Sequence, residues 1–170
     1  MQAFLEEAKR SSRTIANLST AVKNKVLNEM ADALMNHCDF IISHNEKDMM
    51  DARVNNLSES LQDRLLLTGQ RVKDMADAIR QIASQLEPVG RILDGWVTKD
   101  GLNIQKVSIP IGVIGIIYES RPNVTSDTAA LCFKSGNVCV LKGGKEAEHS
   151  NKAIAVVLRE VLAKNKLPEQ

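Results

Sequence analysis

Two short polar segments carry residue types that suit chemistry on an anion. The first runs from Tyr118 to Asn123 and places an acid, a hydroxyl, a guanidinium and an amide side by side. The planar guanidinium of Arg121 can bind two oxygens of a carboxylate or phosphate at once. The amide of Asn123 can donate a hydrogen bond to an oxyanion as its charge develops. The alternative interpretation is a solvated loop with an Arg–Glu pair.

The second polar segment is Lys142-Gly143-Gly144-Lys145. Its two glycines let the backbone approach an anion closely, and its two lysines can hold the charge. The segment is neither a P-loop nor a G-x-G-x-x-G fingerprint, because neither spacing is present. Taken alone it is also compatible with an ordinary exposed turn.

The elements around these segments predict a βαβ unit. The apolar, β-branched run Ile109–Ile117 is typical of a strand buried on both faces of a parallel sheet. Thr125 or Ser126 can cap a following helix that Gly136 ends, and Val138–Leu141 is a second short strand. Both polar segments then leave the carboxyl ends of neighbouring parallel strands. Open α/β sheets bind ligands at that edge.

The rest of the chain predicts helices and one hairpin. Residues 1–86 form helices on apolar periodicity, with Thr68 as a cap, and residues 148–164 form a last helix. Two of the apolar stripes are Val22, Val26, Met30 and Leu34, and Val72, Met75, Ala76, Ile79, Ile82 and Leu86. Residues 87–107 hold two Asp-Gly pairs, Asp94-Gly95 and Asp100-Gly101, which indicate a β-hairpin. We expect this ribbon to pack on another part of the chain or on a partner subunit, because an isolated two-stranded ribbon is marginal.

The composition excludes several classes of protein. The 170 residues carry 22 Lys plus Arg against 21 Asp plus Glu, and 3% aromatic residues, so we expect no nucleic-acid partner. No apolar run approaches the roughly 20 residues of a membrane span, and no signal-peptide core is present, so we expect a cytoplasmic protein without a membrane partner. The His spacing predicts no metal site. Cys38, Cys132 and Cys139 are expected to be reduced, and none is predicted to be a nucleophile.

The two segments together resemble a known family. IPIGVIGIIYESRPNVT followed by TAALCFKSGNVCVLKGGKEAEHSN resembles the aldehyde dehydrogenase superfamily, and in particular its branch of acyl-phosphate reductases. Weaker similarity extends over the whole chain. The resemblance implies an α/β fold with N-terminal helices, a protruding β-hairpin and the first βαβ unit of a Rossmann-like parallel sheet. It also implies NADPH-dependent reduction of L-glutamate 5-phosphate to L-glutamate 5-semialdehyde and phosphate, in proline biosynthesis.

The resemblance also assigns roles to residues. Lys142 matches a lysine that contacts the adenosine ribose, and Lys145 stands where NAD-preferring members carry an acid, so a cation there would favour the 2′-phosphate of NADPH. Together with Gly143 and Gly144 they form the expected cofactor site. Asn123 is the candidate oxyanion donor, and Ser120 and Arg121 are expected to face the substrate phosphate or carboxylate.

The family's nucleophilic cysteine and catalytic domain lie beyond residue 170. We therefore expect residues 1–170 to be the N-terminal part of an NADP-binding domain, divided into a helical region (1–86), an oligomerisation hairpin (87–107) and a βαβα unit (108–170). By itself this piece should be inactive, and the full enzyme is expected to be a homo-oligomer. Two alternatives stay open: another NAD(P)-dependent aldehyde dehydrogenase, which the YESRPN loop disfavours, and a non-catalytic oligomerisation module of the same fold.

Overall fold

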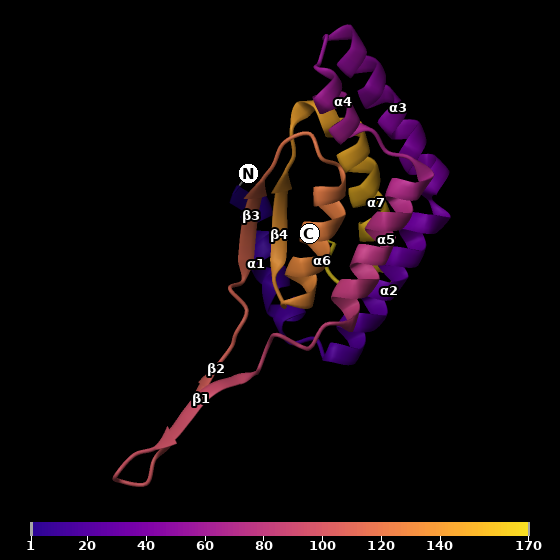
Figure 1. The fold of residues 1–170 in the computed structure, drawn as a ribbon. Helices are drawn as coiled ribbons and strands as arrows, with labels where there is room; N and C mark the ends of the chain where they lie inside the picture. The colour runs from indigo at the N-terminus through magenta and orange to yellow at the C-terminus, as the bar shows by residue number, and fades with distance from the viewer. Residues whose placement is uncertain (1, 170) are drawn as a thin grey trace.

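The computed structural model describes residues 2–169. Five helices come first, a hairpin follows, and a βαβα unit completes the chain (Figure 1). The elements are α1 (Gln2–Ala16), α2 (Thr20–Asn36), α3 (Cys38–Val54), α4 (Glu59–Leu65), α5 (Gly69–Ser84), β1 (Ile92–Val97), β2 (Asn103–Val107), β3 (Val113–Ile117), α6 (Asn123–Lys134), β4 (Val138–Lys142), the 3₁₀ turn η1 (Lys145–Ala147) and α7 (Glu148–Lys164). The predicted order of helices, hairpin and βαβ unit is confirmed.

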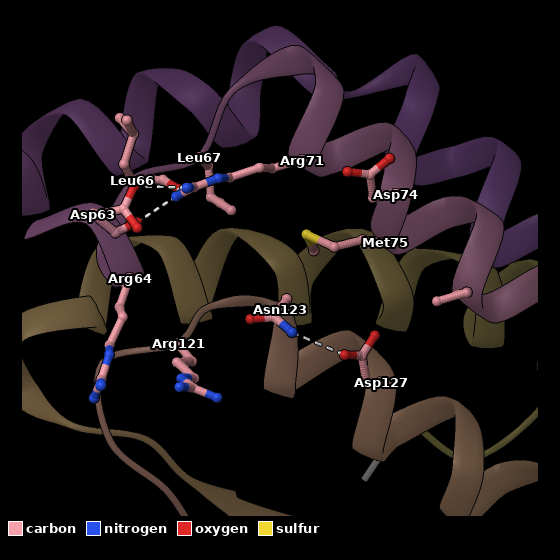
Figure 2. A pocket seen from close by; sticks show the side chains of 11 residues that line it. Asp63, Arg64, Leu66, Leu67, Arg71, Asp74, Met75, Arg121, Asn123 and Asp127 are labelled. Carbon is pink, nitrogen blue, oxygen red and sulfur yellow. Dashed lines mark hydrogen bonds and ion pairs between the residues drawn. The ribbon is translucent and has the colours of Figure 1, made fainter. Parts of the chain in front are cut away.

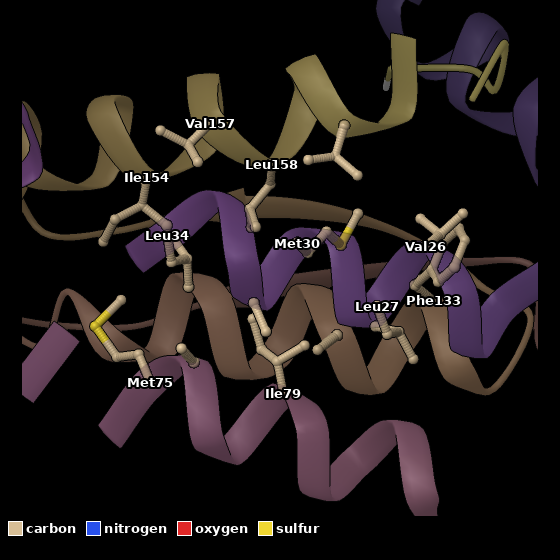
Figure 3. Close-up of a cluster of buried hydrophobic side chains, with 14 of the residues drawn as sticks. Val26, Leu27, Met30, Leu34, Met75, Ile79, Phe133, Ile154, Val157 and Leu158 are labelled. Atoms are coloured by element: carbon tan, nitrogen blue, oxygen red, sulfur yellow. The ribbon is translucent and has the colours of Figure 1, made fainter. Parts of the chain in front are cut away.

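One apolar core joins the N-terminal helices to the βαβα unit. Val26, Leu27, Met30 and Leu34 of α2 pack between Met75 and Ile79 of α5, Phe133 of α6, and Ile154, Val157 and Leu158 of α7 (Figure 3). Truncation of one such buried side chain to Ala typically costs roughly 2–5 kcal/mol. Two residues predicted on these stripes are exposed instead. Val22 faces solvent, and Leu86 lies beyond the end of α5 at Ser84.

The βαβ unit is confirmed, with β3 parallel to β4 and Ile117 opposite Lys142. The prediction that the first strand is buried on both faces is wrong, since Ile117 is 82% exposed and β3 pairs with β4 alone among the described residues. The strand also begins later than the apolar run, after Gly112, whose φ of +117° interrupts the extended chain. Helix α6 packs on β4, while α1 contacts both strands from behind in Figure 1.

The start of α6 differs from the prediction. The helix begins at Asn123, so Thr125 and Ser126 lie inside its first turn and are not caps. Both side chains are buried: Ser126 donates to the carbonyl of Asn123 at 2.9 Å, and Thr125 contacts α7. The predicted end is confirmed, because Gly136 adopts a φ of +73° directly after the helix.

The hairpin extends away from the body of the molecule (Figure 1). Its turn contains Asp100 and Gly101, with Gly101 at a φ of +83°. The other predicted turn is wrong, because Asp94 and Gly95 lie within β1 beside a register shift. The two strands pair only with each other in the described chain, and Trp96 is 51% exposed. Of the two surfaces expected to cover the ribbon, another part of residues 2–169 does not do so, and packing on a partner subunit stays a prediction.

Two buried lysines fix the base of the helical region. Lys23 is 1% exposed and forms an ion pair with Glu87 at 2.8 Å, just before the hairpin. Lys134 donates to the side chain of Asn24 at 2.6 Å and to the carbonyl of Ala83 at 2.9 Å. Because a buried ammonium is costly without such partners, these contacts hold α2, α5 and α6 in one arrangement.

Candidate functional site

The two polar segments lie side by side at the carboxyl ends of β3 and β4. The backbone N–H of Tyr118 donates to the carbonyl of Lys142 at 3.1 Å, which extends the parallel pairing by one bond. Ser120 is 4% exposed, and its hydroxyl donates to Glu146 at 2.7 Å. The sequence-based prediction that parallel pairing brings these segments to one edge is confirmed.

A hydrogen-bonded chain beneath the loops links both strands to α7. The hydroxyl of Thr125 donates to Asn151 at 2.9 Å and so must accept the bond from the hydroxyl of Tyr118 at 2.6 Å, because a hydroxyl has one proton. Burial raises the pKa of Tyr118, so the phenol stays protonated and can serve as this donor. A Cβ added at Gly143 would lie 2.2 Å from Nδ2 of Asn151 and 3.1 Å from Cζ of Tyr118. An alanine at position 143 would therefore displace the side chain of Asn151 and press on the ring of Tyr118.

Helix α3 caps the N-terminus of α7 from a distance in sequence. The carboxylate of Asp48, 2% exposed, accepts hydrogen bonds from the backbone N–H groups of His149 at 3.0 Å and Ser150 at 2.7 Å. Asn45 donates to the hydroxyl of Ser150 at 3.0 Å and accepts from the N–H of Leu67 at 2.7 Å. The negative charge of Asp48 occupies the positive end of the α7 dipole. The N–H groups of His149 and Ser150 are therefore already used and not free for an anion near Lys142–Lys145, here called the lysine turn.

The first cavity, here called the arginine pocket, has a volume of about 320 Å³ and lies between α4, α5 and the start of α6. Figure 2 shows Arg64 and Arg121 on one side of this pocket and Asn123 with Asp127 on α6. Arg71 also lines it, and its guanidinium is held by Asp63 and by the carbonyl of Leu66.

The amide of Asn123 is oriented by its neighbour on α6. Its Nδ2 donates to Oδ2 of Asp127 at 3.0 Å, which leaves the second amide proton available to another acceptor. Burial raises the pKa of Asp127 above its ordinary value. Oδ1 of Asp127 is shielded from solvent and has no hydrogen-bond partner among the described residues.

The second cavity, here called the lysine cleft, has a volume of about 510 Å³ and follows β4, the lysine turn and one face of α7. Lys142 and Lys145 line it with exposed side chains, and neither forms an ion pair with any residue of 2–169. Arg159 adds a further cation from α7. The cleft therefore joins an apolar floor to unpaired positive charge.

None of the three thiols has the features of an activated nucleophile. Burial raises the pKa of Cys38, and a hydrogen bond with Cys132 raises that of Cys139. Cys132 accepts this bond, which lowers its pKa, but its side chain is 6% exposed and lines neither cavity.

The described part of the chain holds neither a cluster of metal ligands nor a membrane-spanning helix. Residues 2–169 hold no group of three or more His, Cys, Asp or Glu side chains that could bind a metal ion. In the same range, every helix is too short or too polar to cross a lipid bilayer.

The predicted site residues divide between the two cavities. Asn123 and Arg121 line the arginine pocket, whereas Lys142, Gly143, Gly144 and Lys145 line the lysine cleft. Ser120 lines neither and connects the loops through Glu146, so its contact with substrate stays a prediction. Sequence reasoning missed Arg64, because nothing in a helical stripe near residue 60 indicates that it meets a loop near residue 121.

The architecture defines the class of protein. The structure of a probable aldehyde dehydrogenase from Listeria monocytogenes superposes with a TM-score of 0.71 at 15% identity, covering 98% of this chain and 34% of that one. The chain therefore has an aldehyde-dehydrogenase fold. No protein-family model matches it.

The particular relatives are gamma-glutamyl phosphate reductases. The enzyme of that name from Aliarcobacter butzleri is 79% identical over 169 residues, which are 99% of this chain and 41% of the relative. The crystal structure of gamma-glutamyl phosphate reductase from Thermotoga maritima superposes with a TM-score of 0.93 at 41% identity, covering 96% of this chain and 40% of that one. The chain thus resembles these reductases along nearly all of its residues and spans about two fifths of their length.

Proposed function

We propose that this chain is the N-terminal, NADP-binding part of an enzyme that reduces L-glutamate 5-phosphate to L-glutamate 5-semialdehyde and phosphate in proline biosynthesis. The observation that carries the proposal is the 79% identity to a gamma-glutamyl phosphate reductase over 99% of the chain. The adjacency of the two polar loops supports it, because a hydride transfer needs cofactor and substrate at neighbouring positions.

The lysine cleft fits the adenosine end of NADPH. Lys142 and Lys145 are exposed cations without an ion-pair partner in residues 2–169, which suits a ribose bearing a 2′-phosphate. Asp48 already caps α7, so these side chains rather than a helix N-terminus would carry the phosphate charge. NADPH, when bound, supplies the hydride for the reduction.

The arginine pocket fits the substrate. In this assignment Asn123 donates its free amide proton to the carbonyl oxygen of the acyl group, where negative charge develops during reduction. Arg121 attracts the substrate anion beside it.

A cysteine nucleophile must come from outside residues 1–170 in this proposal. The thiols of Cys38 and Cys139 are held protonated, and Cys132 is buried away from both cavities. A thiolate attacks an acyl phosphate readily, and the thioester so formed accepts a hydride far better than a carboxylate does. We therefore infer that the 170-residue chain alone has no reductase activity.

The test uses the longer protein in which this chain forms the first part. With L-glutamate 5-semialdehyde and NADP⁺, we expect NADPH formation that depends strictly on added phosphate, because the reverse reaction makes an acyl phosphate. Oxidation at the same rate without phosphate would instead identify an ordinary aldehyde dehydrogenase. Activity of the isolated 170-residue chain would contradict the proposed division of the site.

A double variant of Lys142 and Lys145 tests whether these lysines bind the 2′-phosphate of NADPH. Lys142→Gln with Lys145→Gln should raise the KM for NADPH at least tenfold and change the KM for NADH much less, since only NADPH carries the 2′-phosphate. Lys99→Gln, in the hairpin turn, removes the same kind of charge far from the cleft and serves as the control. Equal effects on both cofactors would remove the 2′-phosphate assignment.

We further infer that the hairpin mediates homo-oligomerisation. The described chain leaves apolar side chains exposed along both strands, and nothing in residues 2–169 pairs with their outer edges. These exposed residues are Ile92, Leu93, Trp96, Val97, Leu102 and Val107. A ribbon of this kind gains stability when a second copy covers its apolar side chains.

A further inference from the structure

The arginine pocket brings charges of both signs to one small volume. Arg64 reaches it from α4, and Arg121 reaches it from the loop between β3 and α6 (Figure 2). Neither guanidinium forms an ion pair with a residue of 2–169, whereas the neighbouring Arg71 forms an ion pair with Asp63. Two uncommitted arginines at one cavity are suited to a carboxylate, which each can bind with two parallel hydrogen bonds.

An acidic group faces the same pocket. Asp127 lines it, and its Oδ2 is used by Asn123. Its Oδ1 is shielded from solvent and receives no hydrogen bond within the described chain. Asp127 thus adds a carboxylate to the lining of a pocket that also holds two guanidiniums, and a ligand with a cationic group can pair with it.

We propose that the arginine pocket binds the α-amino-carboxylate end of an amino-acid substrate, with Arg64 and Arg121 on the carboxylate and Asp127 on the ammonium. That the amino acid is a glutamate derivative rests on the function proposed above. The volume of about 320 Å³ lies at the small end of ligand sites, which suits an amino acid better than a larger acyl group. The pocket also contains Asn123, so a substrate held at its amino-acid end keeps its reacting end close to that amide.

A simple anion satisfies only half of this site. Inorganic phosphate or a dicarboxylate could pair with Arg64 and Arg121, yet it would bring negative charge towards the carboxylate of Asp127. An amine without a carboxylate would have the opposite defect, because it would face two unpaired guanidiniums. Only a zwitterionic head group complements both sides of the pocket.

Binding to the protein tests the assignment with four probes measured by isothermal titration calorimetry. L-Glutamate carries both head groups, glutarate lacks the ammonium, 4-aminobutyrate lacks the α-carboxylate, and inorganic phosphate is a bare anion. We expect L-glutamate to bind at least tenfold more tightly than each of the others, as charged hydrogen bonds of this kind provide. Equal affinity for glutarate, phosphate and glutamate would reduce the site to an anion site and overturn the proposal.

Variants separate the two halves of the recognition. Asp127→Asn should abolish the preference for glutamate over glutarate, whereas Arg64→Gln should abolish the preference for glutamate over 4-aminobutyrate. Arg64 is exposed on α4, so its replacement tests the pocket without disturbing the core. Arg121→Lys should restore only part of the affinity lost in Arg121→Gln, because Lys lacks the planar fork. Arg53→Gln and Asp51→Asn on the exposed side of α3 are matched controls and should change nothing.

Kinetics of the longer enzyme distinguish this proposal from the proposed function. Arg64→Gln and Asp127→Asn should raise the KM for L-glutamate 5-semialdehyde at least tenfold and leave the KM for NADP⁺ unchanged. Normal phosphate-dependent turnover with unchanged KM values in both variants would overturn the pocket assignment and leave the reaction standing. Selective glutamate binding without any such turnover would overturn the reaction and leave the pocket standing.

Discussion

Asp48 on α3 and Ser150 at the start of α7 lie 102 positions apart in the sequence and are joined by hydrogen bonds from both the N–H and the hydroxyl of Ser150. Asn45, one turn before Asp48, bonds the same hydroxyl. Through this contact α3 holds the first turn of α7, and with it the lysine turn that precedes α7. The N-terminal helices therefore help to position the edge of the sheet where the residues predicted to bind ligands lie.

Asp48→Asn should lower the free energy of unfolding by about 2 kcal/mol or more, because the amide keeps one acceptor oxygen and turns its NH2 donor towards one of the two N–H groups of His149 and Ser150. Urea unfolding followed by circular dichroism measures the change. Asp51→Asn, on the exposed side of α3, is the matched control and should remain within about 0.5 kcal/mol of the wild type. Equal stability of the two variants would show that the cap contributes little.

Gly143→Ala should destabilise the chain by about 1–3 kcal/mol, since the new methyl group would displace Asn151 from Thr125 and press on Tyr118. Gly69→Ala makes the same change where nothing lies within 4 Å of the added Cβ, and it should stabilise slightly. Thermal unfolding of both variants provides the comparison. A tolerated alanine at position 143 would mean that Asn151 moves away without cost.

The Lys23–Glu87 pair makes stability depend on pH in the acid range. Burial raises the pKa of Glu87, whereas hydrogen bonds from Lys23 and from the N–H of Val89 lower it. The lowering is larger than the rise, so the net pKa lies below the ordinary value of 4.5. A carboxylate with a lowered folded-state pKa stabilises the fold above its unfolded-state pKa, and this contribution disappears as the pH falls through the folded-state value.

Glu87→Gln removes that titration. The difference in unfolding free energy between wild type and Glu87→Gln should be complete above about pH 4.5 and should shrink as the pH falls below it. Urea unfolding at a series of pH values measures the difference. A gap that stays constant down to about pH 3 would exclude Glu87 as the titrating group.

The proposed role of the hairpin in homo-oligomerisation can be tested at Trp96. Trp96→Ser in the longer protein should shift the population from oligomer to monomer in sedimentation velocity, because Trp96 is an exposed aromatic residue near the end of β1. The circular dichroism of the helices should not change, since among residues 2–169 β1 pairs only with β2. Lys99→Ser in the turn is the control. An oligomer that survives Trp96→Ser intact would contradict the proposed interface.

Local signals in the sequence predicted the elements well. The stripe of α7 and the cap at Thr68 depend on residues within a few positions of each other, and the Thr68 hydroxyl does accept the N–H of Arg71 at 3.2 Å. The two Asp-Gly pairs were harder to separate, because a turn and a bulge both favour such pairs. The structure separates them, because Trp96 pairs with Ile104 across the hairpin and Asp100-Gly101 lies between the two strands.

Long-range contacts could not be predicted in the same way. The sequence gives no sign that three polar helix residues are special, because their partners lie far along the chain. These residues are Asn45, Asp48 and Arg64. The burial of β3 was overestimated for a related reason. An apolar strand sequence indicates that its faces can be covered, but the neighbouring elements decide whether they are.

The distance in sequence between Asp48 and Ser150 also has a consequence for how the chain folds during synthesis. Domains form as the ribosome delivers them from the N-terminus, so α3 emerges about 100 residues before the residue that its carboxylate caps. Until then Asn45 and Asp48 lack Ser150 and His149 as partners, and water can take the place of those groups. The hydrogen bonds between α3 and α7 can therefore form only after residue 150 has been synthesised.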